Sequence, residues 1–154
     1  MQEYQMFING QWLESDSNKF LESINPSTGE SIAHIPKGEI SDVQKAISVA
    51  RNAFDNSAWP QMPYLERAEY LKRIAQLIRE EAYNLAQLET IDTGKTIKQT
   101  TFIDIPMAAA AFEYFANAAP SELKGEVIPL PMPAHSQTVY EPVGVVGAII
   151  PWNY

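Results

Sequence analysis

The spacing of hydrophobic and polar positions changes along the chain. In residues 1–40, short apolar groups alternate with turn residues, a pattern typical of short β-strands. Residues 7–12 hold an Asn-Gly pair between apolar flanks, which predicts a hairpin closed by a two-residue type I′ turn. A turn cluster at residues 24–30 precedes alternation over residues 31–36, which predicts a strand at the edge of a sheet.

Apolar residues at helical spacing begin after this region. Ser41 and Gln44 have the spacing of a capping box, so the first helix should begin at Ser41. The apolar positions behind it repeat with the helical period, and we expect them to form one buried face. These positions are Val43, Ile47, Ala50 and Phe54.

Two further helical tracts follow. Pro63 suits the first turn of the second tract, which should bend near residues 82–84 and stop at Gly94. The third tract covers residues 102–119, and Pro120 should end it.

The C-terminal stretch has a different character. Alternate prolines over residues 129–133 predict an extended connection, and residues 137–141 suit a strand. Residues 143–150 form an unbroken apolar run rich in β-branched side chains, the pattern of a strand buried on both faces of a parallel sheet. Such a strand needs neighbouring strands and covering helices, so we expect the chain to be the first part of a larger α/β domain.

Composition narrows the possible partners. The 154 residues are 45% hydrophobic and 19% charged, which suits one compact domain or a piece of one. Lys and Arg total 11 against 19 Asp and Glu, a formal net charge of -8. Nucleic acids and anionic membranes would repel such a chain, so neither is an expected partner. The N-terminal residues lack the features of a secretory signal, and we expect a cytoplasmic protein.

Some kinds of chemistry are excluded or disfavoured. Cysteine is absent, so these residues contain no disulfide, thiolate metal site or cysteine nucleophile. Residues 93–96 resemble the end of a phosphate-binding P-loop, but Glu89 replaces the first glycine and no strand precedes it, so a helix-terminating turn is favoured. His34 and His135 stand apart from carboxylate clusters, which argues against a transition-metal site, and no Ser-His-Asp set is evident.

One candidate site follows the apolar run. Ligands bind at the carboxyl edge of parallel sheets, and the side-chain amide of Asn153 would lie at that edge. Such an amide can donate a hydrogen bond to a developing oxyanion. The plainer interpretation is a buried Trp152 followed by an asparagine in a turn, and the residues alone favour it.

Five segments occur in the order seen in aldehyde dehydrogenases, and the chain resembles that family along its whole length. The segments are residues 7–12, 24–30, 88–95, 141–147 and 151–154. The chain is most similar to the branch that contains the betaine-aldehyde dehydrogenases.

The resemblance implies an incomplete α/β aldehyde dehydrogenase fold. Residues 1–134 would supply the strands and the helical bundle of the cofactor-binding domain. Residues 135–142 would form an oligomerisation strand, and residues 143–154 the first strand of a Rossmann-like sheet and the start of the active-site loop.

The resemblance also implies an activity. Members of the family oxidise an aldehyde to a carboxylic acid with NAD or NADP, through a cysteine thiohemiacetal, hydride transfer and thioester hydrolysis aided by a glutamate. Asn153 matches the catalytic asparagine that stabilises the oxyanion. The residues that match the cofactor-lining stretch are Ile149, Ile150, Pro151, Trp152 and Asn153.

Two further features are implied in the same way. A monovalent cation would lie near Asp92 and the backbone of Ser23 and Ile24. The complete enzyme would be a homo-oligomer acting on a small-molecule aldehyde. Phe112 and Phe115 could line its substrate pocket, although packing in the core is the better interpretation for both.

Departures from the family limit what this chain can do. The nucleophilic cysteine is missing, and the glycine-rich cofactor turn and the catalytic glutamate would follow Tyr154. We therefore predict an N-terminal part of an aldehyde dehydrogenase that is inactive as an isolated chain. The alternative is a non-catalytic oligomerisation or interaction module derived from the family. An unrelated small helical binding domain would require the order of the segments to be a coincidence.

Overall fold

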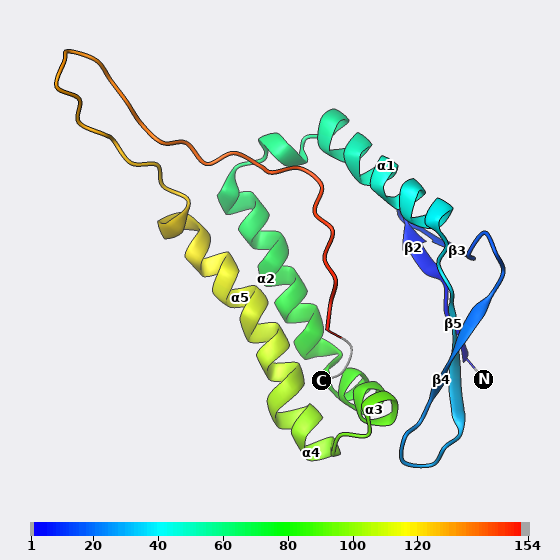
Figure 1. The fold of residues 1–154 in the computed structure, drawn as a ribbon. Helices are drawn as coiled ribbons and strands as arrows, with labels where there is room; N and C mark the ends of the chain where they lie inside the picture. The colour runs from blue at the N-terminus through cyan, green and yellow to red at the C-terminus, as the bar shows by residue number, and fades with distance from the viewer. Residues whose placement is uncertain (1, 152–154) are drawn as a thin grey trace.

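The computed structural model describes residues 2–151 (Figure 1). The elements are β1 (Gln2–Glu3), β2 (Met6–Ile8), β3 (Gln11–Leu13), β4 (Phe20–Ile24), β5 (Ser31–Pro36), α1 (Ile40–Asn56), η1 (Trp59–Gln61), α2 (Tyr64–Glu80), α3 (Ala82–Thr93), α4 (Ile97–Gln99), η2 (Thr100–Asp104) and α5 (Ile105–Glu122). Helices α2 and α5 lie side by side, and the strands lie on the far side of α1 and α3 (Figure 1). This mixed arrangement confirms the predicted α/β class.

The predicted hairpin is confirmed. Strands β2 and β3 pair antiparallel, and Ile8 faces Gln11 across the turn. Asn9 and Gly10 have φ angles of 56° and 73°, which a type I′ turn requires at both central positions.

Strand β5 lies in the centre of its sheet, so the prediction of an edge strand was wrong. The sheet has three strands in the order β1-β5-β4. Strand β1 pairs parallel with β5 along one side, where Gln2 faces Ala33, and β4 pairs antiparallel along the other. Pro36 is tolerated because it is the last residue of the strand, and the partner strand β1 does not extend to it.

Helix α1 begins at Ile40, before the predicted start at Ser41, and the predicted capping box is wrong. Glu39 is the N-cap residue, and its N–H donates to Asp42 Oδ2 at 2.8 Å. A carboxylate is a stronger acceptor than a neutral side chain and is favoured by the helix dipole in the first turn. Asp42 therefore takes the role that the pattern assigned to Gln44.

The apolar face of α1 is largely exposed, contrary to the prediction. Val43 and Ile47 are 56% and 52% exposed, Ala50 is also exposed, and Phe54 is half-buried. The main contacts of the helix are with η1 and β2, near its two ends. No larger element among residues 2–151 covers the middle of this face.

The second helical tract is confirmed as two helices. Pro63 directly precedes α2, and the chain bends at Glu81, next to the predicted bend. Gly94 ends α3 with φ 76°, and its N–H donates to the carbonyl of Thr90 at 3.0 Å. This left-handed cap is the conformation for which glycine is favoured.

The third tract differs from the prediction at both ends. It begins at Ile97 with α4, passes through the π-helical turn η2, and continues as α5 to Glu122. Pro120 therefore does not end the helix. It lies in the last turn, where its missing N–H costs only one backbone hydrogen bond, and Leu123 closes the helix by donating to the carbonyl of Ala119.

Small residues form the core between the helices. The fully or nearly buried residues of α2, α3 and α5 are Ala68, Ala75, Ala86, Ala109 and Ala116. The solvent-accessible surface of the chain is 11868 Å². A compact monomer of 17.2 kDa would expose about 7,800 Å². The chain therefore leaves much apolar surface that its own residues do not cover.

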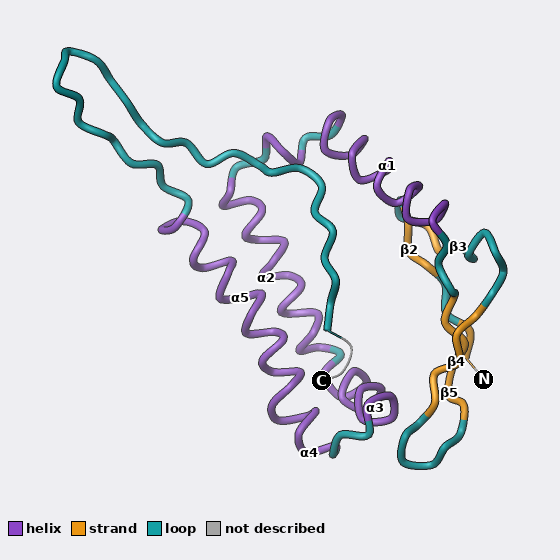
Figure 2. The backbone as a smooth tube through the Cα atoms, viewed as in Figure 1, coloured by secondary structure: helices purple, strands orange, loops and turns teal. Residues whose placement is uncertain are grey.

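The C-terminal stretch is extended but contains no strand within the described residues (Figure 2). The prolines of residues 129–133 lie in an irregular connection, as predicted. Residues 137–141 form only the isolated bridge between Gln137 and Val127, so the predicted strand there was wrong.

The predicted doubly buried strand over residues 143–150 is also absent. Val143 and Ile149 are 91% and 90% exposed. A strand requires hydrogen bonds to a neighbour, and within residues 2–151 no other strand pairs with this segment. In the same range, none of the helices has the length and apolar character needed to cross a membrane.

Candidate functional site

The predicted cofactor-lining segment lies on the surface. Ile149 and Ile150 are 90% and 71% exposed, and Pro151 is exposed as well. Trp152 and the predicted catalytic Asn153 lie outside the described residues. The residues that precede them are extended and exposed, and no strand within residues 2–151 pairs with them.

This segment passes close to α1. A cavity of about 300 Å³ lies between Ala50, Ala53 and Phe54 of α1 and residues 144–146. Gly144 has φ 108°, and a Cβ there would approach the Arg51 guanidinium to 3.3 Å. Glycine therefore suits both the backbone conformation and the close approach at this point.

Two of the residues named in the cation prediction, Asp92 and Ser23, are in contact through their side chains. The Ser23 hydroxyl donates to Asp92 Oδ1 at 2.6 Å and joins β4 to the end of α3. The pairing of β4 with β5 changes register between Ser23 and Ile24, an irregularity of the kind often found beside functional sites. The side chains line a cavity of about 350 Å³, whose other lining residues are Tyr4, Ile32, Ala33, Ile35 and Leu88.

The donor set at Asp92 suits a hard cation of low charge. A carboxylate and a hydroxyl are oxygen ligands, which such ions prefer over nitrogen or sulfur. Residues 2–151 contain no cluster of three or more His, Cys, Asp or Glu side chains that could hold a metal ion. Asp92 is the one carboxylate among the residues that line this cavity.

Asp42 is the centre of a buried polar cluster that sequence reasoning missed. Its carboxylate is 4% exposed and accepts the Ser15 hydroxyl at 2.9 Å and the Asp16 N–H at 3.2 Å. The N–H of Glu39 is the largest cause that lowers the pKa of Asp42, and Ser15 adds to it against the opposing effect of burial. The signal was an acidic residue in a first helical turn, but its partner Ser15 is distant in sequence.

Lys95 neutralises two carboxylates. Its ammonium group donates to Glu89 Oε1 at 2.8 Å and to Asp104 Oδ2 at 3.0 Å, and its side chain is 13% exposed. These bonds, with Glu89 first, raise the pKa of Lys95. Lys95 therefore ties the end of α3 to η2, which supports the rejection of a P-loop at this motif.

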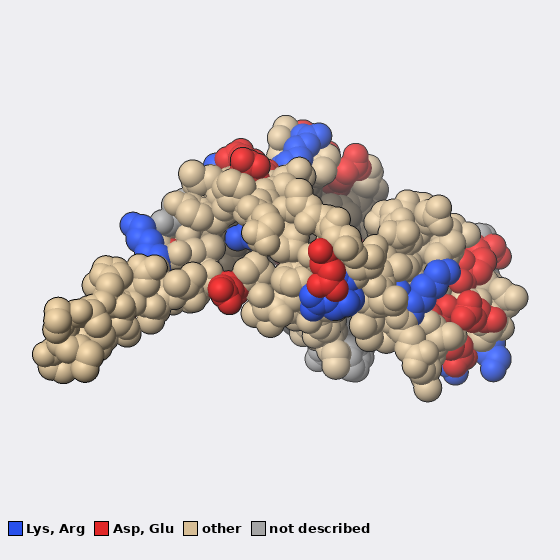
Figure 3. All heavy atoms as spheres, turned by 90° about the horizontal axis from the view of Figure 1, so that it is seen from above, with Lys and Arg blue, Asp and Glu red and all other residues tan. Residues whose placement is uncertain are grey.

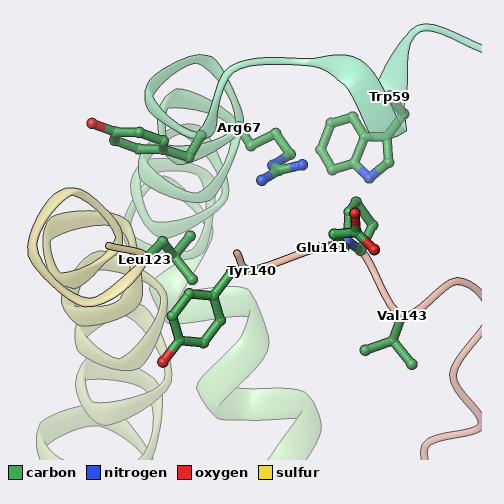
Figure 4. Close-up of a pocket in the computed structure, with 8 residues that line it drawn as sticks. Trp59, Arg67, Leu123, Tyr140, Glu141 and Val143 are labelled. Carbon is green, nitrogen blue, oxygen red and sulfur yellow. The ribbon is translucent and has the colours of Figure 1, made fainter. Parts of the chain in front are cut away.

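A larger cavity, of about 430 Å³, lies where residues 140–143 cross the start of α2 (Figure 4). Its charged lining residues are Arg67 of α2 and Glu141, and the ring of Trp59 lies next to both. The remaining lining residues are Tyr64, Leu123, Tyr140, Pro142 and Val143. The sequence pattern did not indicate this cavity, because its walls come from segments far apart in the chain.

An uncharged arm projects from the end of α5. We use this name for residues 127–140, which contain no Asp, Glu, Lys or Arg. The arm forms the tan projection in Figure 3, whereas charged side chains are spread over the rest of that face. The two legs of the arm are joined by hydrogen bonds such as Ile128 N–H to the Ser136 carbonyl at 2.8 Å.

Phe112 and Phe115 are not core residues. They are 37% and 64% exposed, which corrects the preferred interpretation of both. His34 lies on β5 beside Phe20 and His135 lies in the arm, so these histidines belong to different parts of the molecule.

Comparison with known proteins identifies relatives of the whole chain. A profile of the aldehyde dehydrogenase family matches residues 12–154. Benzaldehyde dehydrogenase from Antirrhinum majus is 40% identical over 149 residues, covering 97% of this chain and 28% of that protein. Betaine aldehyde dehydrogenase from Bacillus subtilis is 40% identical over 150 residues, covering 97% of this chain and 30% of that protein.

Solved structures of aldehyde dehydrogenases also resemble this chain. Indole-3-acetaldehyde dehydrogenase from P. syringae in complex with NAD+ and IAA has a TM-score of 0.88 at 33% identity, over 94% of this chain and 29% of that one. Betaine aldehyde dehydrogenase from Staphylococcus aureus in complex with NAD+ has a TM-score of 0.85 at 36% identity, over 90% of this chain and 28% of that one. The chain therefore spans less than a third of the length of these relatives, and it corresponds to an N-terminal part of them.

Proposed function

The chain belongs to the aldehyde dehydrogenase family, and on this premise we propose that the complete protein oxidises an aldehyde to a carboxylic acid with NAD or NADP. We further propose that the 154 residues by themselves do not catalyse this reaction. The observation that carries both proposals is the match over residues 12–154 in a chain without cysteine.

Asn153 is the proposed catalytic residue. Attack on an aldehyde carbonyl places negative charge on its oxygen, and a side-chain amide N–H can stabilise that charge by donating a hydrogen bond. Without a nucleophile the charge does not form, so Asn153 alone contributes nothing to turnover. This is the physical reason for expecting an inactive isolated chain.

Ile149, Ile150, Pro151 and Trp152 are proposed to line the nicotinamide end of the cofactor. The family match over residues 12–154, which includes this stretch, supports the role. The cofactor, when bound, would accept a hydride from the substrate. The role of this chain is to position and stabilise the reacting carbonyl.

A chimera tests the proposed activity. This chain would replace the matching N-terminal part of the Bacillus subtilis betaine aldehyde dehydrogenase, and NADH formation would be followed with betaine aldehyde and NAD. We expect an active chimera in which Asn153→Ala lowers kcat by about 10²- to 10³-fold.

Matched controls make the result decisive. Asn117→Ala alters another asparagine, on the exposed surface of α5, and should leave kcat unchanged. An Asn153→Ala chimera with undiminished kcat would overturn the assigned role. The isolated chain should form no NADH with any aldehyde, and measurable turnover would overturn the proposal that it is inactive.

Asp92 and the backbone of Ser23 and Ile24 are proposed to hold a monovalent cation. The short Ser23–Asp92 hydrogen bond supports this site, because it gathers oxygen ligands beside the irregularity in β4. The test compares thermal unfolding in potassium chloride and in choline chloride at equal ionic strength. Potassium should stabilise the chain, and Asp92→Asn should remove the difference; equal unfolding temperatures in the two salts would reject the site.

The complete protein is proposed to be a homo-oligomer that uses residues 135–142, most of which belong to the arm. The arm offers uncharged extended backbone, while the chain as a whole carries a net charge of -8 that would oppose association elsewhere. Sedimentation of the chimera with Val139→Lys, on the exposed arm, should show weaker association than the parent. The alternative function, a non-catalytic interaction module, would be favoured by a chimera that associates but has no activity.

A further inference from the structure

Asn9 and Gly10 form the exposed turn between β2 and β3. Their φ angles of 56° and 73° are those of a type I′ turn. Within residues 2–151 the Asn9 side chain has no hydrogen-bond partner, and neither has the backbone N–H of Gly10. A Cβ at Gly10 would meet nothing within 4 Å, so the space beside this residue is open. The turn therefore exposes a side-chain amide next to a free backbone nitrogen.

A side-chain amide of asparagine can react with the backbone nitrogen that follows it. Hydroxide removes the proton of that nitrogen, which then forms a bond to Cγ of the asparagine. The bond between Cγ and Nδ2 breaks, the nitrogen leaves as ammonia with a proton from water, and a five-membered succinimide ring remains. Water then opens the ring at either carbonyl and yields aspartate or isoaspartate, without oxidation or reduction. A glycine as the following residue favours ring closure, because it has no Cβ to obstruct the ring.

We propose that Asn9 is a site of spontaneous deamidation in the folded chain and that its isoaspartate product disrupts the β2–β3 hairpin. Isoaspartate carries the main chain through Cβ and Cγ, so it lengthens the backbone of the turn by one atom. The length of the turn sets the register of a hairpin, so the pairing of Ile8 with Gln11 is lost. Ile8 is 8% exposed and belongs to the strand that contacts α1, so the change also weakens the packing of the hairpin on this helix.

Most other asparagines within residues 2–151 lack a free nitrogen beside them. Asn25 precedes Pro26, whose nitrogen has no proton to lose. In a helix, the N–H that follows an asparagine donates to a carbonyl one turn earlier. The asparagines with such a neighbour are Asn52, Asn56, Asn84 and Asn117.

Asn18 is a matched control within the same chain. It is exposed and has φ 53°, so its backbone conformation is close to that of Asn9. The next residue is Lys19, which has a Cβ and whose N–H donates to the Ser17 hydroxyl at 3.3 Å. Both differences oppose attack on the side-chain amide, so Asn18 should stay unmodified while Asn9 reacts.

The test follows the two asparagines in the 154-residue chain during incubation in mildly alkaline buffer. Chymotrypsin cuts after aromatic residues such as Trp12 and so separates Asn9 from Asn18. Mass spectrometry measures the conversion of each amide, and electron-transfer fragmentation distinguishes isoaspartate from aspartate. We expect conversion at Asn9 to be at least about tenfold faster than at Asn18, because only Asn9 precedes a glycine.

Variants identify the reacting groups. Gly10→Ala should slow the conversion of Asn9 at least about tenfold, because its Cβ obstructs ring closure. Asn9→Gly keeps a residue suited to the turn and should abolish the acidic species that isoelectric focusing detects in the incubated chain. Asn18→Gly, at the position of similar φ, should leave that species unchanged. An acidic species that persists in Asn9→Gly would overturn the assignment.

A comparison with the unfolded chain tests the contribution of the turn. The folded chain should convert Asn9 without denaturant. Conversion of Asn9 only in urea would mean that the folded turn protects the amide. Equal rates at Asn9 and Asn18 in the folded chain would mean that the turn gives no selectivity. Either result would refute the site.

Hydrogen exchange tests the effect on the hairpin. The isoaspartate form is separated by ion exchange, and the amide of Gln11 should exchange faster in it than in the unmodified chain, because its pairing with Ile8 is lost. Asn9→Asp reproduces the other product and should keep the slow exchange, since aspartate suits a type I′ turn. Unchanged exchange in the isoaspartate form would contradict the proposed disruption.

Discussion

The pair of helices α2 and α5 and the segment of residues 143–151 all present apolar side chains, but only the helices bury some of them. The helices pack through fully buried alanines such as Ala75 and Ala109, whereas Val143 and Ile149 are almost fully exposed. Each helix satisfies its backbone hydrogen bonds internally and needs only one packing partner. An extended segment needs a neighbouring strand for its backbone as well as a cover for its side chains.

This difference shows that apolar character does not determine burial by itself. The two helices are separated in the chain by α3, α4 and η2, but they lie against each other and cover each other's apolar residues. The segment 143–150 has a pattern typical of an interior strand, but among residues 2–151 no strand lies beside it. Much of the large accessible surface of the chain therefore comes from this segment and from the apolar face of α1. Neither is covered by another element within residues 2–151.

The largest effect is expected for a substitution between the packed helices α2 and α5. Ala109→Asp would bury a carboxylate without a counter-charge between α2 and α5, at a cost of about 3 kcal/mol or more. Urea unfolding followed by circular dichroism measures the loss. The control is Ala110→Asp, one residue along on the exposed side of the same helix, which should change stability by less than about 0.5 kcal/mol. Equal losses in the two variants would show that the helices do not pack as described.

A second prediction compares Gly94, the cap of α3, with Gly147 in the exposed segment. Gly94→Ala places a Cβ 2.8 Å from the Pro26 ring at a residue with φ 76°, so we expect a loss of about 2 kcal/mol. Gly147→Ala adds its Cβ where nothing lies within 4 Å, so its effect should be below about 0.5 kcal/mol. Both are measured by urea unfolding. A larger loss at Gly147 would mean that the segment is more tightly packed than the structure shows.

The smallest effect depends on pH. Because the folded pKa of Asp42 lies below its unfolded value, its contribution to stability is present above about pH 4 and is lost as the pH falls through the folded pKa. Asp42→Asn should therefore lower stability at neutral pH and flatten its fall in acid, as measured by unfolding at a series of pH values. Asp16→Asn, which keeps the backbone N–H to Asp42, should retain the acid dependence.

Local chemistry accounts for the parts of the fold that were predicted correctly. The Asn9-Gly10 turn and the Gly94 cap depend on backbone conformations that few residue types adopt, so the residue type itself is the signal. The failures have a common cause as well. Glu39 and not Ser41 is the N-cap residue of α1, because Asp42 accepts the Glu39 N–H, and Asp42 also accepts the hydroxyl of Ser15, which only the folded chain brings near.

The candidate site also has parts that the sequence predicted and parts that it did not. The order of the motifs identified the family. The Ser23 hydroxyl donates to Asp92, but the cation site at these residues stays a prediction. Sequence reasoning missed the cavity that Arg67 and Glu141 line. The spacing of residues within one element does not show which distant segment will lie next to it in the folded chain. Asn153 stays a prediction, since it lies outside the described residues.

The sequence alone determined the turn types, the approximate helices, the family and the absence of a cysteine nucleophile, because each depends on residue identity or on spacing within one segment. Only the tertiary structure decided that β5 is a central strand, that the capping box of α1 consists of Glu39 and Asp42, and that one face of α1 is exposed. These properties depend on which distant segments meet. A strand, a cap or a buried face exists only where a second part of the molecule supplies the hydrogen bonds or the apolar cover.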